Sequence, residues 1–313
     1  MRTLDVATAA EILRTGGVVA IPTETVYGLA ADATDDAAVA KIFAAKGRPA
    51  SHPLIVHLGS AAELEGWVHA IPPSARRLAD VLWPGPLTMI FARGPRARDA
   101  VTGGLDTVAI RVPAHPIALA LIAAAGPLAA PSANRFGSVS PTTAEHVRVD
   151  LEGRIDGVVD GGPCAVGIES TILDVTSAVP SLLRPGGVAR ETIEEVLGAP
   201  ILRAGEDAPR APGSLASHYA PRARVVTAHR SELAEAARGL AGVAILAVAD
   251  PGVAGATWIP VPADPAERAR TLYAALRAID ARGLAHAIVE LPEDERGLGL
   301  AIADRLRRAA GPR

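Results

Sequence analysis

The sequence contains no glutamine, and Asn134 is its only asparagine. Of its 31 lysines and arginines, Lys41 and Lys46 are the two lysines. Alanine, arginine, glycine and proline are abundant. This bias indicates a drift in amino-acid composition that has replaced most exchangeable lysines by arginine and most amides by other residues. A lysine or amide that persists in such a background is favoured as a residue kept for chemistry. Lys46 and Asn134 are therefore the first candidates, whereas nothing in the sequence assigns a partner to Lys41, which we expect to be solvated.

The scarcity of cysteine excludes proteins that are stabilised by internal disulfides. Cys164 stands alone, so there is no internal disulfide framework, and its expected role is that of a small buried apolar residue. The N-terminus lacks a basic segment followed by an apolar one, as a signal peptide would have. The most apolar stretch, residues 116–131, is interrupted by Gly126 and Pro127 and is too short to span a membrane. We expect a cytoplasmic protein.

The length, the net charge and the absence of several catalytic motifs reduce the number of possible protein classes further. With 313 residues, 49% of them apolar, the chain is long enough for two folded domains. Its formal net charge of −3 argues against a broad nucleic-acid surface. There is no Gly-x-x-x-x-Gly-Lys-Ser/Thr loop, no Gly-x-Ser-x-Gly elbow and no His-Glu-x-x-His helix. These absences argue against P-loop nucleotidases, α/β-hydrolases and zincin proteases.

Short β-branched runs alternate with helical patterns through residues 1–202, which predicts an α/β domain. The expected strands are 17–21, 53–57, 87–91, 107–112 and 170–175. The expected helices are 35–46, 61–70, 74–82, 116–124, 142–150 and 191–197. Gly47 follows the first of these helices where a C-cap glycine is expected, which places Lys46 and Arg48 at a helix-to-loop junction.

Residues 203–222 are rich in proline, glycine and alanine and read as a linker. The linker carries His218 and Tyr219, which are unusual in a spacer and predict that part of it docks. Residues 223–313 form a second α/β domain with strands 223–227, 242–248 and 285–291, helices 231–239, 263–282 and 296–309, and a parallel sheet. Gly297-Leu298-Gly299 resembles part of a dinucleotide fingerprint, but the full pattern is missing and no cofactor is assigned.

The polar residues that follow the apolar strands are the candidate site. After the first strand, an extended segment would place Thr23, Thr25 and Tyr27 on one side and Glu24 on the other. The structural alternative is a loop whose threonines cap the next helix. Arg111 ends a strand, where a guanidinium is costly unless it pairs with an anion or reaches a cleft.

Two further pairs lie two residues apart and could point together: Lys46 with Arg48, and Ser132 with Asn134. The structural alternatives are a solvated helix end for the first pair and an asparagine turn for the second. Ser170 begins a strand, and Arg184 precedes Pro185-Gly186-Gly187. No covalent nucleophile accompanies this set. It suits an anionic ligand with phosphates and a carboxylate, with catalysis by positioning and electrostatics.

Together these segments resemble the YrdC-like family, in order along the chain. The resemblance is carried by Pro22-Thr23-Glu24-Thr25-Val26-Tyr27-Gly28-Leu29, Lys46-Gly47-Arg48-Pro49, Pro53-Leu54-Ile55-Val56-His57, Trp83-Pro84-Gly85-Pro86-Leu87-Thr88, Arg111-Val112-Pro113, Pro131-Ser132-Ala133-Asn134, residues 167–172 and Leu183-Arg184-Pro185-Gly186. His218-Tyr219-Ala220-Pro221 and Gly297-Leu298-Gly299-Leu300-Ala301 are similar to the family's long, two-domain form.

The resemblance implies an L-threonylcarbamoyladenylate synthase, a nucleotidyltransferase. Such enzymes make threonylcarbamoyl-AMP and pyrophosphate from L-threonine, bicarbonate and ATP, and Mg²⁺ arrives with the ATP. A tRNA threonylcarbamoyl transferase complex would use the product to modify adenosine in tRNA, and direct contact of this chain with tRNA is expected to be weak. The implied fold is a twisted open α/β sheet with a concave basic cavity, followed by a smaller Rossmann-like α/β domain.

The resemblance also assigns roles, which are carried over to matching positions of this sequence. Catalysis falls on Lys46 and Arg48. ATP binding falls on Lys46, Arg48, Ser132, Asn134, Arg184 and Tyr219, with Lys46 and Asn134 expected on opposite walls of the pocket. L-threonine binding falls on Thr23, His57, Arg111 and Ser170. No side chain is expected to bind a metal directly, and the linker is expected to cover the cavity.

Two alternatives stay open from the sequence. The related hydrogenase-maturation carbamoyltransferase contains a similar domain, but its zinc-finger modules need more cysteines than Cys164 supplies. A non-catalytic RNA-binding module could use the same basic cavity, although the acidic net charge and the lack of clustered aromatics weigh against it.

Overall fold

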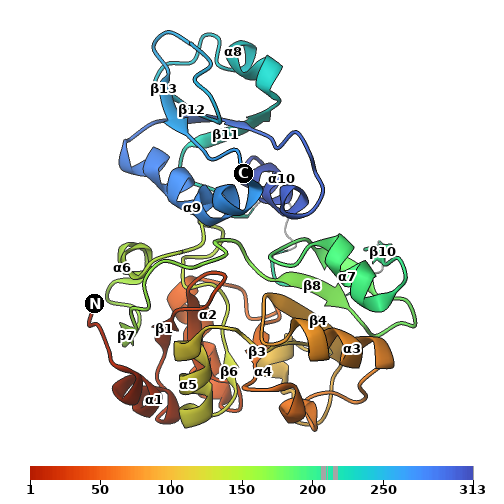
Figure 1. Ribbon diagram of the computed structural model, residues 1–313. Helices are drawn as coiled ribbons and strands as arrows, with labels where there is room; N and C mark the ends of the chain where they lie inside the picture. Colours follow the sequence, from red (N-terminus) through yellow and green to blue (C-terminus); the bar gives the residue numbers. More distant parts are fainter. Residues whose placement is uncertain (206–208, 210, 214–217, 313) are drawn as a thin grey trace. The chain divides into compact units, whose positions relative to one another are not determined.

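The computed structural model describes residues 1–205, 209, 211–213 and 218–312. The chain divides into two compact units, which are described separately (Figure 1). Unit 1 comprises residues 1–136, 141–165 and 169–214, and unit 2 comprises residues 137–140, 166–168 and 215–313. Residues 206–208, 210 and 214–217, which belong to the predicted linker, lie outside the described part. None of the described helices is long and apolar enough to cross a membrane.

Unit 1 is built on a mixed sheet whose ten described strands run in the order β10-β9-β8-β4-β5-β3-β6-β2-β1-β7. The strands are β1 Val19–Ile21, β2 Gly28–Asp32, β3 Ile55–His57, β4 Leu87–Ala92, β5 Thr107–Arg111, β6 Leu128–Ala129, β7 Gly157–Val158, β8 Thr171–Asp174, β9 Ser181–Arg184 and β10 Leu202–Arg203. The helices are α1 Val6–Arg14, α2 Asp36–Lys46, α3 Pro73–Leu82, α4 Asp99–Thr102, α5 Pro116–Ala125, α6 Ala144–Leu151 and α7 Arg190–Leu197, with a 3₁₀ turn, η1 Ala61–Leu64.

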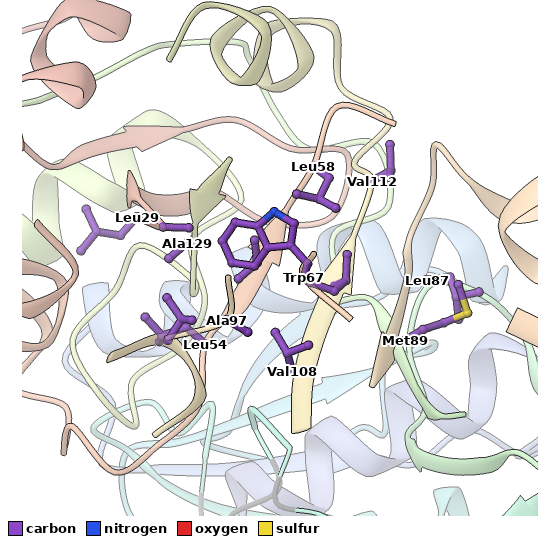
Figure 2. Packing of buried hydrophobic residues seen from close by; sticks show 14 of the residues in the cluster. Leu29, Leu54, Leu58, Trp67, Leu87, Met89, Ala97, Val108, Val112 and Ala129 are labelled. Carbon is purple, nitrogen blue, oxygen red and sulfur yellow. The ribbon is translucent and has the colours of Figure 1, made fainter. Parts of the chain in front are cut away.

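One face of this sheet is packed against the main hydrophobic core. Side chains alternate along each strand, so Leu87, Met89 and Phe91 of β4 enter this core while Thr88 and Ile90 face the other way. Helices α2, α3 and α7 supply the apolar side chains that cover the core face. The indole of Trp67 is fully buried at its centre, among leucine, valine and alanine side chains (Figure 2).

The opposite face is covered differently at its two ends. At the β1–β2–β6 end, helices α1 and α5 lie side by side and bury it with Leu13, Leu121 and other apolar side chains (Figure 1). At the β3–β5–β4–β8 end the cover is a small cluster that includes Ile90, Ile172 and Ala211. Ala211 belongs to the predicted linker, so this part of the linker docks on unit 1. We call this second area the site face.

Unit 2 contains a sheet of four described strands in the order β11-β14-β12-β13, and every pair is parallel, as predicted. Its strands are β11 Arg224–Ala228, β12 Val243–Ala247, β13 Thr257–Pro260 and β14 His286–Glu290. Its helices are α8 Leu233–Ala236, α9 Pro265–Ala281 and α10 Leu298–Ala309, with a 3₁₀ turn, η2 Arg230–Glu232. Strand β13 was not predicted, because its alternation is broken by a proline at its end.

Candidate functional site

The site face carries a row of residues that crosses five neighbouring strands and is polar on all of them except β8. Arg111 of β5 is in register with His57 of β3 on one side and with Thr88 of β4 on the other. The row continues through Ile172 of β8 to Arg184 of β9. Residues paired across strands point to the same face, so the sheet gathers side chains that are far apart in sequence. His57, Arg111 and Arg184 each end their strand, as the sequence predicted for Arg111.

The guanidinium of Arg111 is 4% exposed and is held by groups from two loops. Its Nη1 donates to Thr25 Oγ1 at 2.9 Å, and its Nε donates to the Gly85 carbonyl at 3.2 Å. Its Nη2 lies 2.7 Å from Glu24 Oε1, an ion-pair distance, although the angles are not those of a hydrogen bond. This arrangement fixes the plane of the guanidinium fork, which a carboxylate ligand needs.

Glu24 and Thr25 therefore contact the same guanidinium, and the predicted extended alternation of residues 23–27 is wrong. The segment bends because Thr23 Oγ1 donates to the Val26 carbonyl at 2.6 Å and lies 2.9 Å from Thr25 Oγ1. Burial is the largest single influence and raises the pKa of Glu24, but the charge and hydrogen bonding of Arg111 together with backbone hydrogen bonds outweigh it, and the net direction is downward. Glu24 thus stays ionised and balances the arginine charge.

Ser170 and Arg184 form the next contact along the row. Arg184 Nη2 donates to the Ser170 carbonyl at 2.7 Å and to its Oγ at 3.2 Å, while Arg184 Nη1 donates to the Pro212 carbonyl at 2.9 Å. Ser170 Oγ also lies 2.7 Å from Thr88 Oγ1. Gly186 allows this close packing, since a Cβ there would lie 2.4 Å from the Glu169 oxygen. The Arg184 guanidinium is thus tied to β8 and to the linker.

Lys46 is enclosed by the loop that follows β6. Helix α2 ends at Lys46, and Gly47 adopts the left-handed conformation with φ of 64°, as predicted for a C-cap glycine. The Lys46 Nζ donates to the carbonyls of Ser132 at 2.5 Å and Asn134 at 2.7 Å, and its own carbonyl accepts from Phe136 N at 2.9 Å. Lys46 and Asn134 are therefore direct neighbours, and their predicted placement on opposite walls of a pocket is wrong.

The environment of the Lys46 ammonium disfavours its charge in the absence of an anion. Burial, and then the neighbouring Arg48, lower the pKa of Lys46 well below its usual value, while Asp150 opposes them. Arg48 donates to the Pro53 carbonyl at 2.9 Å and its guanidinium lies 5.8 Å from the ring centroid of Phe136. An anion such as a phosphate, placed beside these two cations, would offset both effects.

His57 is also buried and neutral. Burial, and then the charge of Arg111, lower the pKa of His57 to about 3. Its Nδ1 lies 3.2 Å from the Ile55 carbonyl. A ring in this state can orient a ligand by hydrogen bonding, but it cannot act as a cation near neutral pH.

Both parts of the chain match protein-family models. Residues 11–186 match the family described as "Telomere recombination" (Sua5_yciO_yrdC), and residues 188–311 match "Threonylcarbamoyl-AMP synthase, C-terminal domain". The threonylcarbamoyl-AMP synthase of Pyrococcus abyssi is 44% identical over 319 residues, covering 97% of this chain and 94% of that protein. The Bacillus subtilis synthase is 45% identical over 324 residues, covering 98% and 93%.

This chain belongs to the threonylcarbamoyl-AMP synthase family.

A solved structure of a family member supports the assignment along nearly the whole chain. P. abyssi Sua5 complexed with L-threonine matches with a TM-score of 0.90 and 41% identity, covering 97% of this chain and 94% of that one. Escherichia coli YciO matches 58% of this chain with a TM-score of 0.51 and 27% identity. The fold class implied by the sequence resemblance, a YrdC-like sheet followed by a smaller α/β domain, is confirmed.

In this member of the family, the structure brings together nine of the ten residues predicted from the sequence, in two neighbouring groups. His57, Arg111, Ser170 and Arg184 belong to the polar row or contact it, and Thr23 is linked to it through Thr25. Lys46, Arg48, Ser132 and Asn134 surround the end of α2. The segment of residues 23–28 links the groups, because Thr25 binds Arg111 and Gly28 is bridged to Ser132. Tyr219, the tenth, lies in unit 2, where its ring stacks on Tyr273 with centroids 5.8 Å apart.

The sequence interpretation missed three residues that contribute to the candidate site. Glu24 is the partner of Arg111, Thr88 is the partner of Ser170, and the Pro212 carbonyl accepts from Arg184. The available signal for Glu24 was a carboxylate placed shortly after an apolar strand. Lys41 is exposed, as expected, and its Nζ also donates to the Gly16 carbonyl at 2.6 Å. Cys164 is buried, as predicted.

Proposed function

We propose that this chain is an L-threonylcarbamoyladenylate synthase that acts in the cytoplasm. It would join L-threonine, bicarbonate and ATP, which arrives with Mg²⁺, into threonylcarbamoyl-AMP and release pyrophosphate. The product would pass to a tRNA threonylcarbamoyl transferase complex for adenosine modification, with at most weak contact between this chain and tRNA. The family membership and the L-threonine complex of P. abyssi Sua5 support this proposal.

The single observation that carries the proposal is the environment of Lys46. Its ammonium is 2% exposed, and its two hydrogen bonds within the described residues go to backbone carbonyls. An ammonium has three N–H donors, so one is left for a ligand. A buried cation of this kind, beside Arg48, needs an anion to offset its burial, and the phosphates of ATP supply one.

The proposed threonine site lies along the polar row. The carboxylate of L-threonine would bind Arg111, whose orientation Glu24 and Thr25 maintain. Thr23, His57 and Ser170 would provide hydrogen-bonding groups for the rest of the amino acid. Ser132, Asn134 and Arg184 would bind the nucleotide.

The reaction would then need positioning and charge stabilisation rather than a covalent intermediate with the protein. The threonine nitrogen forms a C–N bond to the carbon of bicarbonate, and water is lost to give a carbamate. A carbamate oxygen forms a bond to the α-phosphorus of ATP while the bond from that phosphorus to the bridging oxygen breaks. Negative charge on the departing pyrophosphate would be stabilised by Lys46 and Arg48.

The proposal is tested by measuring pyrophosphate release from purified protein with each substrate omitted in turn. We expect release that requires both L-threonine and bicarbonate. If the protein instead bound RNA tightly and released no pyrophosphate, the reading as a non-catalytic RNA-binding module would replace this proposal.

A further inference from the structure

Unit 2 contains a cavity of about 390 Å³ at one edge of its parallel sheet. Its lining includes Arg230, which follows β11, Val248, which follows β12, Ala263, which follows β13, and Glu290 at the end of β14. The cavity therefore lies at the carboxyl ends of all four described strands of this sheet. In open α/β sheets, ligands bind at this edge.

Arg268 is the cationic side chain buried in this cavity. It belongs to α9 and is 5% exposed. Among the described residues, its one hydrogen bond runs from Nη2 to the Glu290 carbonyl. A guanidinium has five N–H donors, so Arg268 keeps donors for an anion in the cavity. Burying a guanidinium that is so incompletely bonded is costly unless a ligand completes its contacts.

The N-terminus of α10 supplies a second group for an anion. Gly299, in its first turn, lines the cavity, and no side chain caps this twelve-residue helix or places a negative charge in its first turn. Gly297 has φ of 53°, and a Cβ at Gly299 would lie 2.0 Å from the Asp294 oxygen. The Gly297-Leu298-Gly299 fragment thus brings the first turn of a helix without a side-chain cap to the cavity wall, with the Gly299 N–H donating to the Arg296 carbonyl at 2.9 Å.

Glu290 provides an acceptor beside these donors. It is 3% exposed, and its Oε2 accepts from Val248 N at 2.7 Å. Its Oε1 lies 3.9 Å from Arg230 Nη1, which is too long for a hydrogen bond and leaves this oxygen able to accept one from a ligand. In doubly wound folds, an acidic residue after a strand binds the hydroxyls of a ribose. The remaining wall includes the apolar residues Leu291, Pro292 and Ile302.

We propose that this cavity is a second ligand site, separate from the proposed synthase site, and that it binds a nucleoside monophosphate. The phosphate would contact Arg268 and the α10 N-terminus, the ribose would donate to Glu290, and the base would lie on the apolar wall. Three carboxylates line the cavity: Asp294 binds Arg296, Glu290 binds the Val248 amide through Oε2, and Glu293 is exposed. The site does not depend on the reaction proposed for unit 1.

The test uses the full chain with AMP as the probe, and hydrogen exchange read by mass spectrometry to locate binding. We expect AMP to protect amides in residues 290–302 of the parent protein. Arg268→Met should weaken this protection at least about tenfold in AMP concentration, because it removes a charge-assisted contact. The matched control is Arg282→Met, which changes an exposed arginine at the other end of α9 and should behave as the parent.

A second variant addresses the risk that Arg268→Met destabilises unit 2. Ala263→Trp adds bulk from the exposed rim of the cavity and keeps Arg268 and Glu290, so it should also abolish the protection. Protection that is absent in the parent, or unchanged in Ala263→Trp, would overturn the proposal. Inorganic phosphate that protects as well as AMP would overturn the nucleoside assignment, and adenosine that protects as well as AMP would overturn the role of Arg268.

Discussion

Replacing Lys46 by methionine separates the proposed catalytic role of its ammonium from any role in folding. Methionine retains an unbranched apolar side chain in a site that is 2% exposed, so packing around the end of α2 should survive. The Ser132 and Asn134 carbonyls lose a donor, at a cost of about 1–3 kcal/mol each if left unsatisfied. This cost is offset because the variant no longer buries an ammonium whose pKa is lowered by that burial.

The expected loss of activity is much larger than the loss of stability. A preorganised charge that acts on the transition state contributes roughly 2.7–4 kcal/mol, which corresponds to a fall in kcat of about 10²–10³. Pyrophosphate release measures kcat, and thermal unfolding measures stability in the same preparations. Lys41→Met is the matched control, since Lys41 lies on the same helix and its Nζ contacts the Gly16 carbonyl. A folded Lys46→Met protein with turnover within about tenfold of the Lys41→Met control would refute the assigned role.

Three further predictions follow from buried ionisable groups. Glu24→Gln leaves Arg111 without its ion-pair partner and should cost roughly 3 kcal/mol of unfolding free energy. Because the folded-state pKa of Glu24 is lowered, its contribution is present above the ordinary value of 4.5 and is lost as the pH falls through the lowered value. Urea unfolding across this range should show the loss in the parent and not in Glu24→Gln; equal pH dependence would contradict it. His57, with its pKa lowered to about 3, should keep neutral-ring NMR shifts through the ordinary titration range near 6.5, and a titration there would show a solvated ring. Burial raises the pKa of Cys164 to about 12, so a thiol reagent should modify it at neutral pH only after unfolding.

The sequence predicted the elements with strong patterns and missed those without them. Helix α2 ends at Lys46 with Gly47 as its cap, as the apolar spacing and the glycine indicated. Strand β2 was missed because Gly-Leu-Ala-Ala-Asp has neither alternation nor β-branched residues, and its place in the sheet comes from antiparallel pairing with β1. The helix expected at 61–70 is a 3₁₀ turn over Ala61–Leu64, since Gly66 with φ of 80° ends it.

Residues of the candidate site were identified from the sequence, but their contacts were not. The sequence indicated Arg111 as a strand-end cation and singled out Arg184 before Pro185, yet only the register of β5, β4, β8 and β9 shows that they share one row. The partnership of Glu24 with Arg111 depends on a bend that side-chain hydrogen bonds of Thr23 create, and a two-residue period cannot represent it. Long-range register and local side-chain bonding are the two features that the pattern of one sequence does not contain.

The most direct test of the proposed function follows the carbon of bicarbonate into the product. Purified protein would be incubated with ¹³C-bicarbonate, L-threonine and MgATP, and the nucleotides would be analysed by mass spectrometry. We predict threonylcarbamoyl-AMP with the label in its carbamoyl group, formed only when all three substrates are present. An AMP product that carries no labelled carbon, or that forms without L-threonine, would contradict the account.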